Sequence, residues 1–128
     1  MTVLLLDTHV VLWMVSEPHR LGSRATAEIA NLENDVLVSV ASVWEVAIKS
    51  ALGRLSAPEN LWDEVEASGV TIITIERDDA VTAGALPPHH RDPFDRMLVA
   101  QAGLRRAQLV TADATLRLYD VPVLHAAR

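Results

Sequence analysis

The sequence predicts an α/β fold in which helices cover a mainly parallel sheet. Short aliphatic runs alternate with longer segments of helical periodicity along the whole chain, as in repeated βαβ units. The short runs are almost entirely apolar, which is typical of parallel strands buried on both faces. The chain has 128 residues, half of them hydrophobic, which suffices for one core. We therefore expect a single domain over residues 1–128.

The expected elements follow from periodicity and from the residues that end helices. Five segments rich in aliphatic and β-branched residues are the predicted strands: 3–6, 36–39, 70–74, 108–111 and 121–124. Seven segments have a helical pattern: 10–15, 23–32, 42–52, 59–68, 79–85, 93–106 and 114–118. Gly53 and Gly69 each follow such a segment as expected C-caps, and Pro93 occupies a first-turn position where a missing N–H costs nothing.

The composition excludes several kinds of chemistry. Because the chain has no cysteine, it has no disulfide, thiolate metal site or cysteine nucleophile. No apolar stretch reaches the roughly 20 residues of a membrane-spanning helix, and Asp7 interrupts the apolar start, which has no basic segment before it as a signal peptide would. We expect a cytoplasmic protein. The net charge of −6 argues against a broad basic surface for long nucleic acids, but it leaves room for a local site.

Four acidic residues are expected at one edge of the sheet. Asp7 and Asp113 directly follow the first and fourth predicted strands. Glu45 lies one turn into the helix after the second strand, and Asp95 lies in the first turn of the helix that precedes the fourth strand. Both helices should begin at the carboxyl edge, where open parallel sheets bind their ligands. We therefore expect the four carboxylates to converge in one crevice.

Such a crevice requires a cation. Carboxylates that crowd together repel each other, and their pKa values rise unless positive charge is supplied. Mg²⁺ or Mn²⁺ is the expected ion, because hard divalent cations prefer oxygen ligands and keep several bound waters. A phosphodiester-cleaving site needs this chemistry, since the ion activates a water and neutralises charge at the leaving oxygen.

The same residues also have structural interpretations. Four acidic side chains stand at or beside the start of a predicted helix and could act only as caps: Asp7, Asp92, Asp95 and Asp113. For Asp92 this interpretation is complete. Glu45 precedes Lys49 by four residues, the spacing of a helical ion pair, although its neighbours make nearly every face of that helix apolar.

The histidines and tryptophans have their own alternatives. His89 and His90 follow two prolines in a segment that we interpret as a solvated surface loop, with a ligand role as the alternative. Trp13, Trp44 and Trp62 lie on amphipathic helical segments. For them core packing or a protein interface is the expectation, and base stacking is the alternative.

Four segments, in chain order, resemble the successive acidic motifs of PIN domains: 4–9 (LLLDTH), 42–45 (SVWE), 90–96 (HRDPFDR) and 109–113 (LVTAD). The third is especially similar to one branch of VapC-type toxins. The resemblance covers essentially the whole chain. It implies a three-layer α/β/α sandwich with a five-stranded parallel sheet of order 3-2-1-4-5. It also implies an Mg²⁺- or Mn²⁺-dependent endoribonuclease that cleaves RNA, forms homodimers and is neutralised by a cognate antitoxin.

Site residues are carried over by position. The acidic catalytic and metal-binding residues of the family are matched by four positions: Asp7, Glu45, Asp95 and Asp113. Thr111 matches a hydroxyl residue that supports the site, and Asp92 is additional in this branch. By this analogy a metal-bound water attacks phosphorus, oriented by Asp95 or Asp113. Three basic residues near these motifs are candidates for steering phosphate groups: Lys49, Arg91 and the motif-matched Arg96.

Two other functions compete with the nuclease. A PIN-like interaction module would keep the fold without catalysis, but all four acidic positions are occupied. A phosphotransfer enzyme would also place an Asp after the first strand. Such enzymes usually carry a second Asp or a Gly close behind it, whereas Thr8, His9 and Val10 follow Asp7 here.

Overall fold

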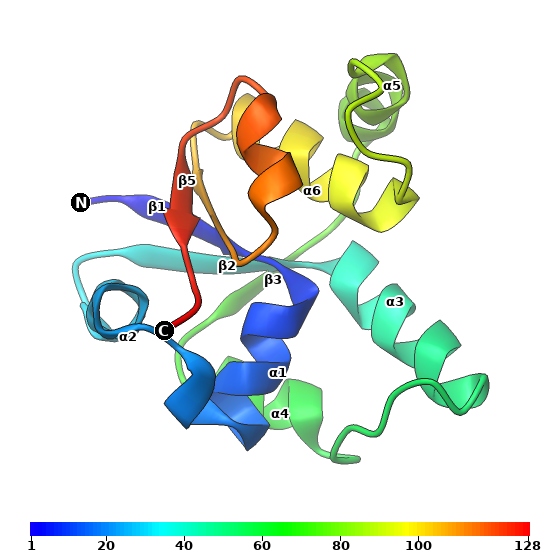
Figure 1. The fold of residues 1–128 in the computed structure, drawn as a ribbon. Helices are drawn as coiled ribbons and strands as arrows, with labels where there is room; N and C mark the ends of the chain where they lie inside the picture. Colours follow the sequence, from blue (N-terminus) through cyan, green and yellow to red (C-terminus); the bar gives the residue numbers. More distant parts are fainter.

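A computed structural model describes residues 1–128 and contains one five-stranded sheet, all of whose strands are parallel. The strand order is β3-β2-β1-β4-β5, which confirms the expected order 3-2-1-4-5. The bounds of the strands are β1 Val3–Leu6, β2 Asp35–Ser39, β3 Thr71–Ile73, β4 Gln108–Thr111 and β5 Val123–His125. Helices lie on both faces of this sheet, as in the expected three-layer sandwich (Figure 1).

The connections between strands are helical. The α-helices are α1 Thr8–Ser16, α2 Ser23–Ala30, α3 Val40–Ala51, α4 Leu61–Ala67, α5 Arg77–Ala85 and α6 Pro93–Leu104. Two short 3-10 helices, η1 Pro18–Arg20 and η2 Ala114–Leu118, complete the set, and the sequence pattern predicted only the second. None of these helices is both long and apolar enough to cross a membrane.

Strand β1 is the centre of the core and is buried on both faces. Leu4 and Leu6 belong to a cluster of buried side chains that includes residues of α1, α2 and α4. Leu5, between them, belongs to a second cluster that includes residues of α6. All three leucines are fully buried. The unbroken apolar run therefore reflects a parallel strand covered by helices on both sides, as predicted.

Some helices begin or end at other residues than predicted, for local reasons. Helix α1 begins at Thr8, earlier than expected, because Asp7 Oδ1 accepts a hydrogen bond from the backbone N–H of Val10 at 3.1 Å and caps the first turn. Helix α6 ends at Leu104 because Arg106 takes a left-handed φ of 53°, which closes a helix.

The two edge strands also differ from the prediction. Strands β3 and β5 each pair with one neighbour only, and each covers three residues. Strand β5 begins at Val123 instead of residue 121, because Pro122 has no N–H to donate, although its carbonyl accepts a hydrogen bond from Leu109. These differences leave the carboxyl ends of β1, β2 and β4, and the helix starts beside them, where the strand pattern places them.

Candidate active site

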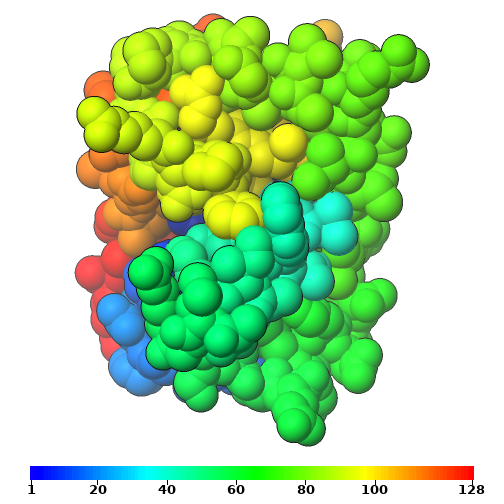
Figure 2. Space-filling model, turned by 90° about the vertical axis from the view of Figure 1, so that its right-hand side faces the viewer, coloured from blue at the N-terminus to red at the C-terminus, as the bar shows by residue number.

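A pocket of about 220 Å³ lies where β1 and β4 end. We call it the acidic pocket, and its lining residues are Asp7, His9, Trp13, Glu45, Lys49, Asp92, Asp95, Ala112 and Asp113. In Figure 2 a hollow separates α3, in teal and green, from the yellow start of α6, and blue atoms of the first residues show inside it. All four predicted carboxylates therefore meet in one pocket, together with Asp92.

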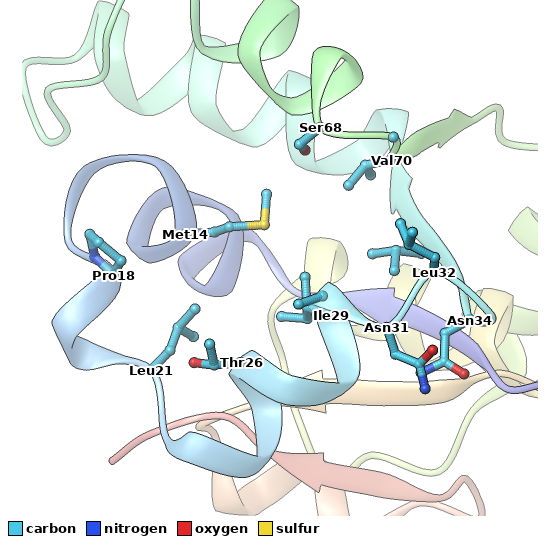
Figure 3. A pocket seen from close by; sticks show the side chains of 13 residues that line it. Met14, Pro18, Leu21, Thr26, Ile29, Asn31, Leu32, Asn34, Ser68 and Val70 are labelled. Carbon is cyan, nitrogen blue, oxygen red and sulfur yellow. The ribbon is translucent and has the colours of Figure 1, made fainter.

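A larger cavity of about 390 Å³ lies elsewhere, at the amino ends of β2 and β3. Figure 3 shows apolar side chains such as Met14, Ile29 and Val70 around it. No acidic, basic or histidine side chain lines this cavity. Of these two cavities, the acidic pocket alone has side chains suited to acid–base or metal chemistry, although the apolar cavity is the larger.

Asp7 is fixed through both of its oxygens. Its residue is 6% exposed, Oδ1 caps α1, and Oδ2 accepts a hydrogen bond of 2.5 Å from the hydroxyl of Thr111 at the end of β4. Burial raises the pKa of Asp7 above its ordinary value, and the hydrogen bonds from Thr111 and Val10 oppose this rise. Asp7 is thus both a helix cap and part of the pocket, so the two interpretations of this residue are compatible.

Glu45 enters the pocket from α3 and is 3% exposed. Its Oε2 lies 2.5 Å from Lys49 Nζ, so the alternative ion pair is present. Its Oε1 lies 2.6 Å from the hydroxyl oxygen of Thr8, which is also 2.9 Å from Ser42 Oγ. Because a hydroxyl has one proton, Thr8 donates to the carboxylate and accepts from Ser42. The hydrogen bond to Glu45 also raises the pKa of Lys49.

Two aspartates begin α6, and they have different roles. Asp92 Oδ1 accepts hydrogen bonds from the backbone N–H groups of Phe94, at 2.8 Å, and Asp95, at 3.3 Å, which confirms Asp92 as the helix cap. Asp95 makes no capping bond, and its side chain is 20% exposed in the pocket. Burial, followed by the negative charges of Asp92 and Asp7, raises the pKa of Asp95 to about 7.

Asp113 follows β4 and caps η2 through Oδ1, which accepts a 2.9 Å hydrogen bond from the N–H of Thr115. Its Oδ2 lies 3.0 Å from His90 Nε2. Burial by itself raises the pKa of Asp113, but the hydrogen bonds from Thr115 and His90 outweigh it and hold this pKa below the ordinary value. The capping interpretation of Asp113 is therefore correct but incomplete.

His90 is the residue that sequence reasoning misplaced. Its side chain is 20% exposed and lies inside the cluster instead of in a solvated loop, with Nε2 3.0 Å from Asp113 Oδ2 and 3.2 Å from Asp95 Oδ2. The potential ligand atoms of these three residues all lie within 4.8 Å of one another. The sequence feature that could have indicated this position is that His90 is the first residue of the matched segment 90–96. The neighbouring His89 is exposed, as expected.

Arg96 does not face a phosphate site. Its guanidinium donates hydrogen bonds to the carbonyl oxygens of Ala83 and Leu86, both at 2.9 Å, and of Pro87 at 3.0 Å. The predicted role of Arg96 in steering phosphates is therefore wrong, because its donors are used to hold the segment between α5 and α6. Of the other basic candidates, Lys49 is paired with Glu45 and Arg91 is exposed.

An aromatic pair stands beside the pocket. The rings of Trp44 and Phe94, neighbours in sequence of two pocket carboxylates, are 5.4 Å apart at 77°, in an edge-to-face arrangement. Trp44 is 62% exposed, whereas Trp13 and Trp62 pack against the larger buried cluster. Core packing therefore explains Trp62, Trp13 combines core packing with lining the acidic pocket, and Trp44 is exposed enough to contact a protein partner or a nucleic acid base.

Comparisons with known proteins agree with this geometry. The family model described as PIN domain matches residues 4–122. The chain is 35% identical over 125 residues to the ribonuclease VapC22 of Mycobacterium tuberculosis (strain ATCC 25618 / H37Rv), and the match covers 95% of each chain.

Solved structures show the same fold at lower identity. A chain from the VapBC2 structure of Rickettsia felis, bound to a DNA fragment from its promoter, matches with a TM-score of 0.71 at 13% identity over 98% of this chain and 99% of that chain. A chain of the toxin–antitoxin system VapBC-5 from Mycobacterium tuberculosis matches with a TM-score of 0.60 at 16% identity, over the same two shares. The chain therefore belongs to the PIN-domain family, in its VapC-type branch.

Proposed function

We propose that this protein is an Mg²⁺- or Mn²⁺-dependent endoribonuclease and the toxin component of a toxin–antitoxin pair. One observation carries the proposal. The carboxylates of Asp7, Glu45, Asp95 and Asp113 line a single pocket in a chain that is 35% identical to a ribonuclease over 95% of its length. The two buried clusters share one sheet, which supports a single domain over residues 1–128.

The residues of the pocket fit a hard divalent cation. Five acidic side chains line the pocket, and Lys49 is the one lysine or arginine among the lining residues. Burial raises the pKa of Asp95, and the negative charges of the neighbouring carboxylates raise it further. The donors are oxygens, apart from the imidazoles of His9 and His90, and the chain has no thiolate. Oxygen-rich sites of this kind suit Mg²⁺ and Mn²⁺.

The cation would be held by Asp7, Glu45, Asp95 and Asp113. When bound, it lowers the pKa of a coordinated water and neutralises charge on the scissile phosphate. Asp7 and Glu45 need little reorganisation, since Thr111, Val10, Thr8 and Lys49 already hold all four of their oxygens.

Asp95 is the carboxylate best suited to take a proton from the attacking water. Its Oδ2 faces His90, whereas its Oδ1 accepts no hydrogen bond from the protein. A bound cation would lower the pKa of Asp95 from its raised value in the metal-free protein, so the assignment rests on the uncommitted Oδ1 atom. Asp113 has both of its oxygens engaged, by Thr115 and His90, and is therefore assigned to binding.

The substrate and partners follow from the relatives. RNA is proposed as the substrate because VapC22 is a ribonuclease. A cognate antitoxin is proposed as a partner because chains of the same fold occur in toxin–antitoxin complexes, and the exposed Trp44 beside the pocket offers apolar surface for such a contact. A homodimer and a cytoplasmic location complete the proposal, in keeping with the VapC-type branch.

Cleavage of single-stranded RNA by partner-free protein tests the proposal. We expect cleavage with Mn²⁺ and none with excess EDTA. Asp7→Asn keeps the shape and the capping oxygen but removes one anionic ligand, so cleavage should fall by about 100-fold or more. Asp120→Asn, an exposed carboxylate outside the pocket, is the matched control. Undiminished cleavage in EDTA would exclude metal-ion catalysis, and binding of a partner without any cleavage would favour the interaction module.

A further inference from the structure

We propose that His90 is a positioning residue of the acidic pocket, whose Nε2–H group holds the carboxylates of Asp95 and Asp113 together so that both can serve one cation. The inference deepens the proposed function, because it assigns a residue and a role to the same site. Both nitrogens of the His90 imidazole make polar contacts within the site.

The contacts of the His90 ring fix its orientation. The backbone N–H of Asp92 donates a hydrogen bond of 3.0 Å to Nδ1. On the other side of the ring, Nε2 lies 3.0 Å from Asp113 Oδ2 and 3.2 Å from Asp95 Oδ2. The imidazole therefore bridges the start of α6 to the end of β4, two segments that each supply one carboxylate.

These contacts decide which nitrogen carries the proton. A backbone N–H can only donate, so Nδ1 must accept with its lone pair, and the proton of a neutral ring is then on Nε2. Direct ligation of a metal through Nε2 would need the opposite tautomer, whose Nδ1–H would face the N–H of Asp92. The Nε2–H group therefore donates a hydrogen bond to Asp113 and lies 3.2 Å from the Asp95 carboxylate, and the ring does not act as a ligand.

The loop that carries His90 is itself held in place. The hydroxyl of Tyr119 accepts a 2.9 Å hydrogen bond from the N–H of His90 and donates one of 3.0 Å to the carbonyl of Pro87. The Arg96 guanidinium donates to the same Pro87 carbonyl and to the carbonyls of Ala83 and Leu86. Tyr119 is 5% exposed and belongs to the second buried cluster, so the loop is anchored to the core.

Donor groups that hold metal-binding carboxylates commonly change metal affinity by about 10- to 100-fold when removed. We therefore expect the Kd for Mn²⁺, measured without RNA by calorimetry or by the electron paramagnetic resonance of free Mn²⁺, to rise by about that factor in His90→Ala. His90→Gln should recover most of the affinity, because the Gln amide offers an N–H donor at similar reach. His89→Ala is the matched control, since this exposed histidine packs on Tyr119 and touches no pocket carboxylate.

The tautomer gives a second measurement on the unmutated protein. Nitrogen chemical shifts of the His90 imidazole, recorded with and without Mg²⁺, should show the proton on Nε2 in both states. Loss of this proton on adding Mg²⁺ would make His90 a ligand and overturn the inference, as would loss of affinity in His90→Ala with no recovery in His90→Gln. This measurement also decides the matter if the alanine variant does not fold.

Different results would overturn the proposed function and the role of His90. A wild-type protein that binds no Mn²⁺ would overturn the proposed function along with the role of His90. Wild-type protein that binds Mn²⁺ and cleaves RNA, beside a His90→Ala variant with the same Kd and the same cleavage rate, would overturn only the inference. A higher Kd with an unchanged rate at saturating Mn²⁺ would support positioning of the metal ligands.

Discussion

Replacing Asp95 by Asn should stabilise the metal-free protein and reduce the stabilisation that the protein gains on binding Mn²⁺. The pKa of Asp95 is about 7 in the folded chain against an ordinary value of 3.8. This difference corresponds to about 4 kcal/mol of unfavourable free energy once the carboxyl is ionised. Solvent screens part of it, since the side chain is 20% exposed, so we expect about 2 kcal/mol. Asn avoids this cost because it stays neutral and keeps an oxygen facing His90.

The sign of the pH dependence follows from the direction of the shift. The folded pKa is higher than the unfolded one, so the wild type binds the extra proton when folded and loses stability as pH rises from about 4 to about 7. In EDTA the variant and the wild type should melt together near pH 4. Above pH 7 the Tm of Asp95→Asn should be higher by about 6 °C, the equivalent of about 2 kcal/mol for a domain of this size.

Thermal melts from pH 4 to 8.5, with EDTA and with Mn²⁺, measure both effects. Mn²⁺ should raise the Tm of the wild type, and it should raise that of Asp95→Asn much less, because binding to the folded state alone is stabilising in proportion to affinity. Asp120→Asn provides the baseline for an exposed carboxylate. A variant that melts below the wild type at pH 8 in EDTA, or a difference that does not change with pH, would refute the destabilising effect of burying the Asp95 charge among other carboxylates.

Three further substitutions have definite expected outcomes. Thr111→Val removes the donor to Asp7 Oδ2 with little change in volume, so RNA cleavage should fall by about 10-fold while the Tm changes by only a few degrees. Asp79→Ala should lower the free energy of unfolding by about 3 kcal/mol in urea titrations, because Asp79 is buried and forms a two-point ion pair with Arg105. Gly22→Ala should also destabilise, by about 1–3 kcal/mol, since a Cβ there would lie 2.9 Å from the carbonyl oxygen of Ala127.

The part of the site that follows strand ends could be predicted from the sequence. Asp7 and Asp113 come directly after apolar runs that form parallel strands. Parallel strands end at the same edge of a sheet, so the strand order was enough to predict that these two carboxylates lie close together. The position of Glu45 in the pocket could be predicted because α3 follows β2 and therefore begins at the same edge of the sheet. The family and the sheet order, which the resemblance supplied, are also confirmed. The metal, the homodimer and the catalytic roles of these residues stay predictions.

The residues that the sequence misplaced depend on contacts between distant segments. Two prolines before His89 and His90 suggest a solvated loop, but the position of His90 is set by Tyr119, 29 residues later in the chain. Arg96 was predicted to bind phosphate groups because the sequence gives no sign that backbone carbonyls accept its hydrogen bonds. A local pattern shows neither kind of contact.

The hydrogen bond between Thr111 and Asp7 joins positions 104 residues apart, so the acidic pocket has no counterpart in an incomplete chain. During synthesis on the ribosome Asp7 is added long before Thr111 and Asp113. Without β4 beside β1 the pocket lacks both Thr111 and Asp113, so the site is incomplete. The cation site is therefore a property of the assembled sheet, and no single segment of the chain carries it.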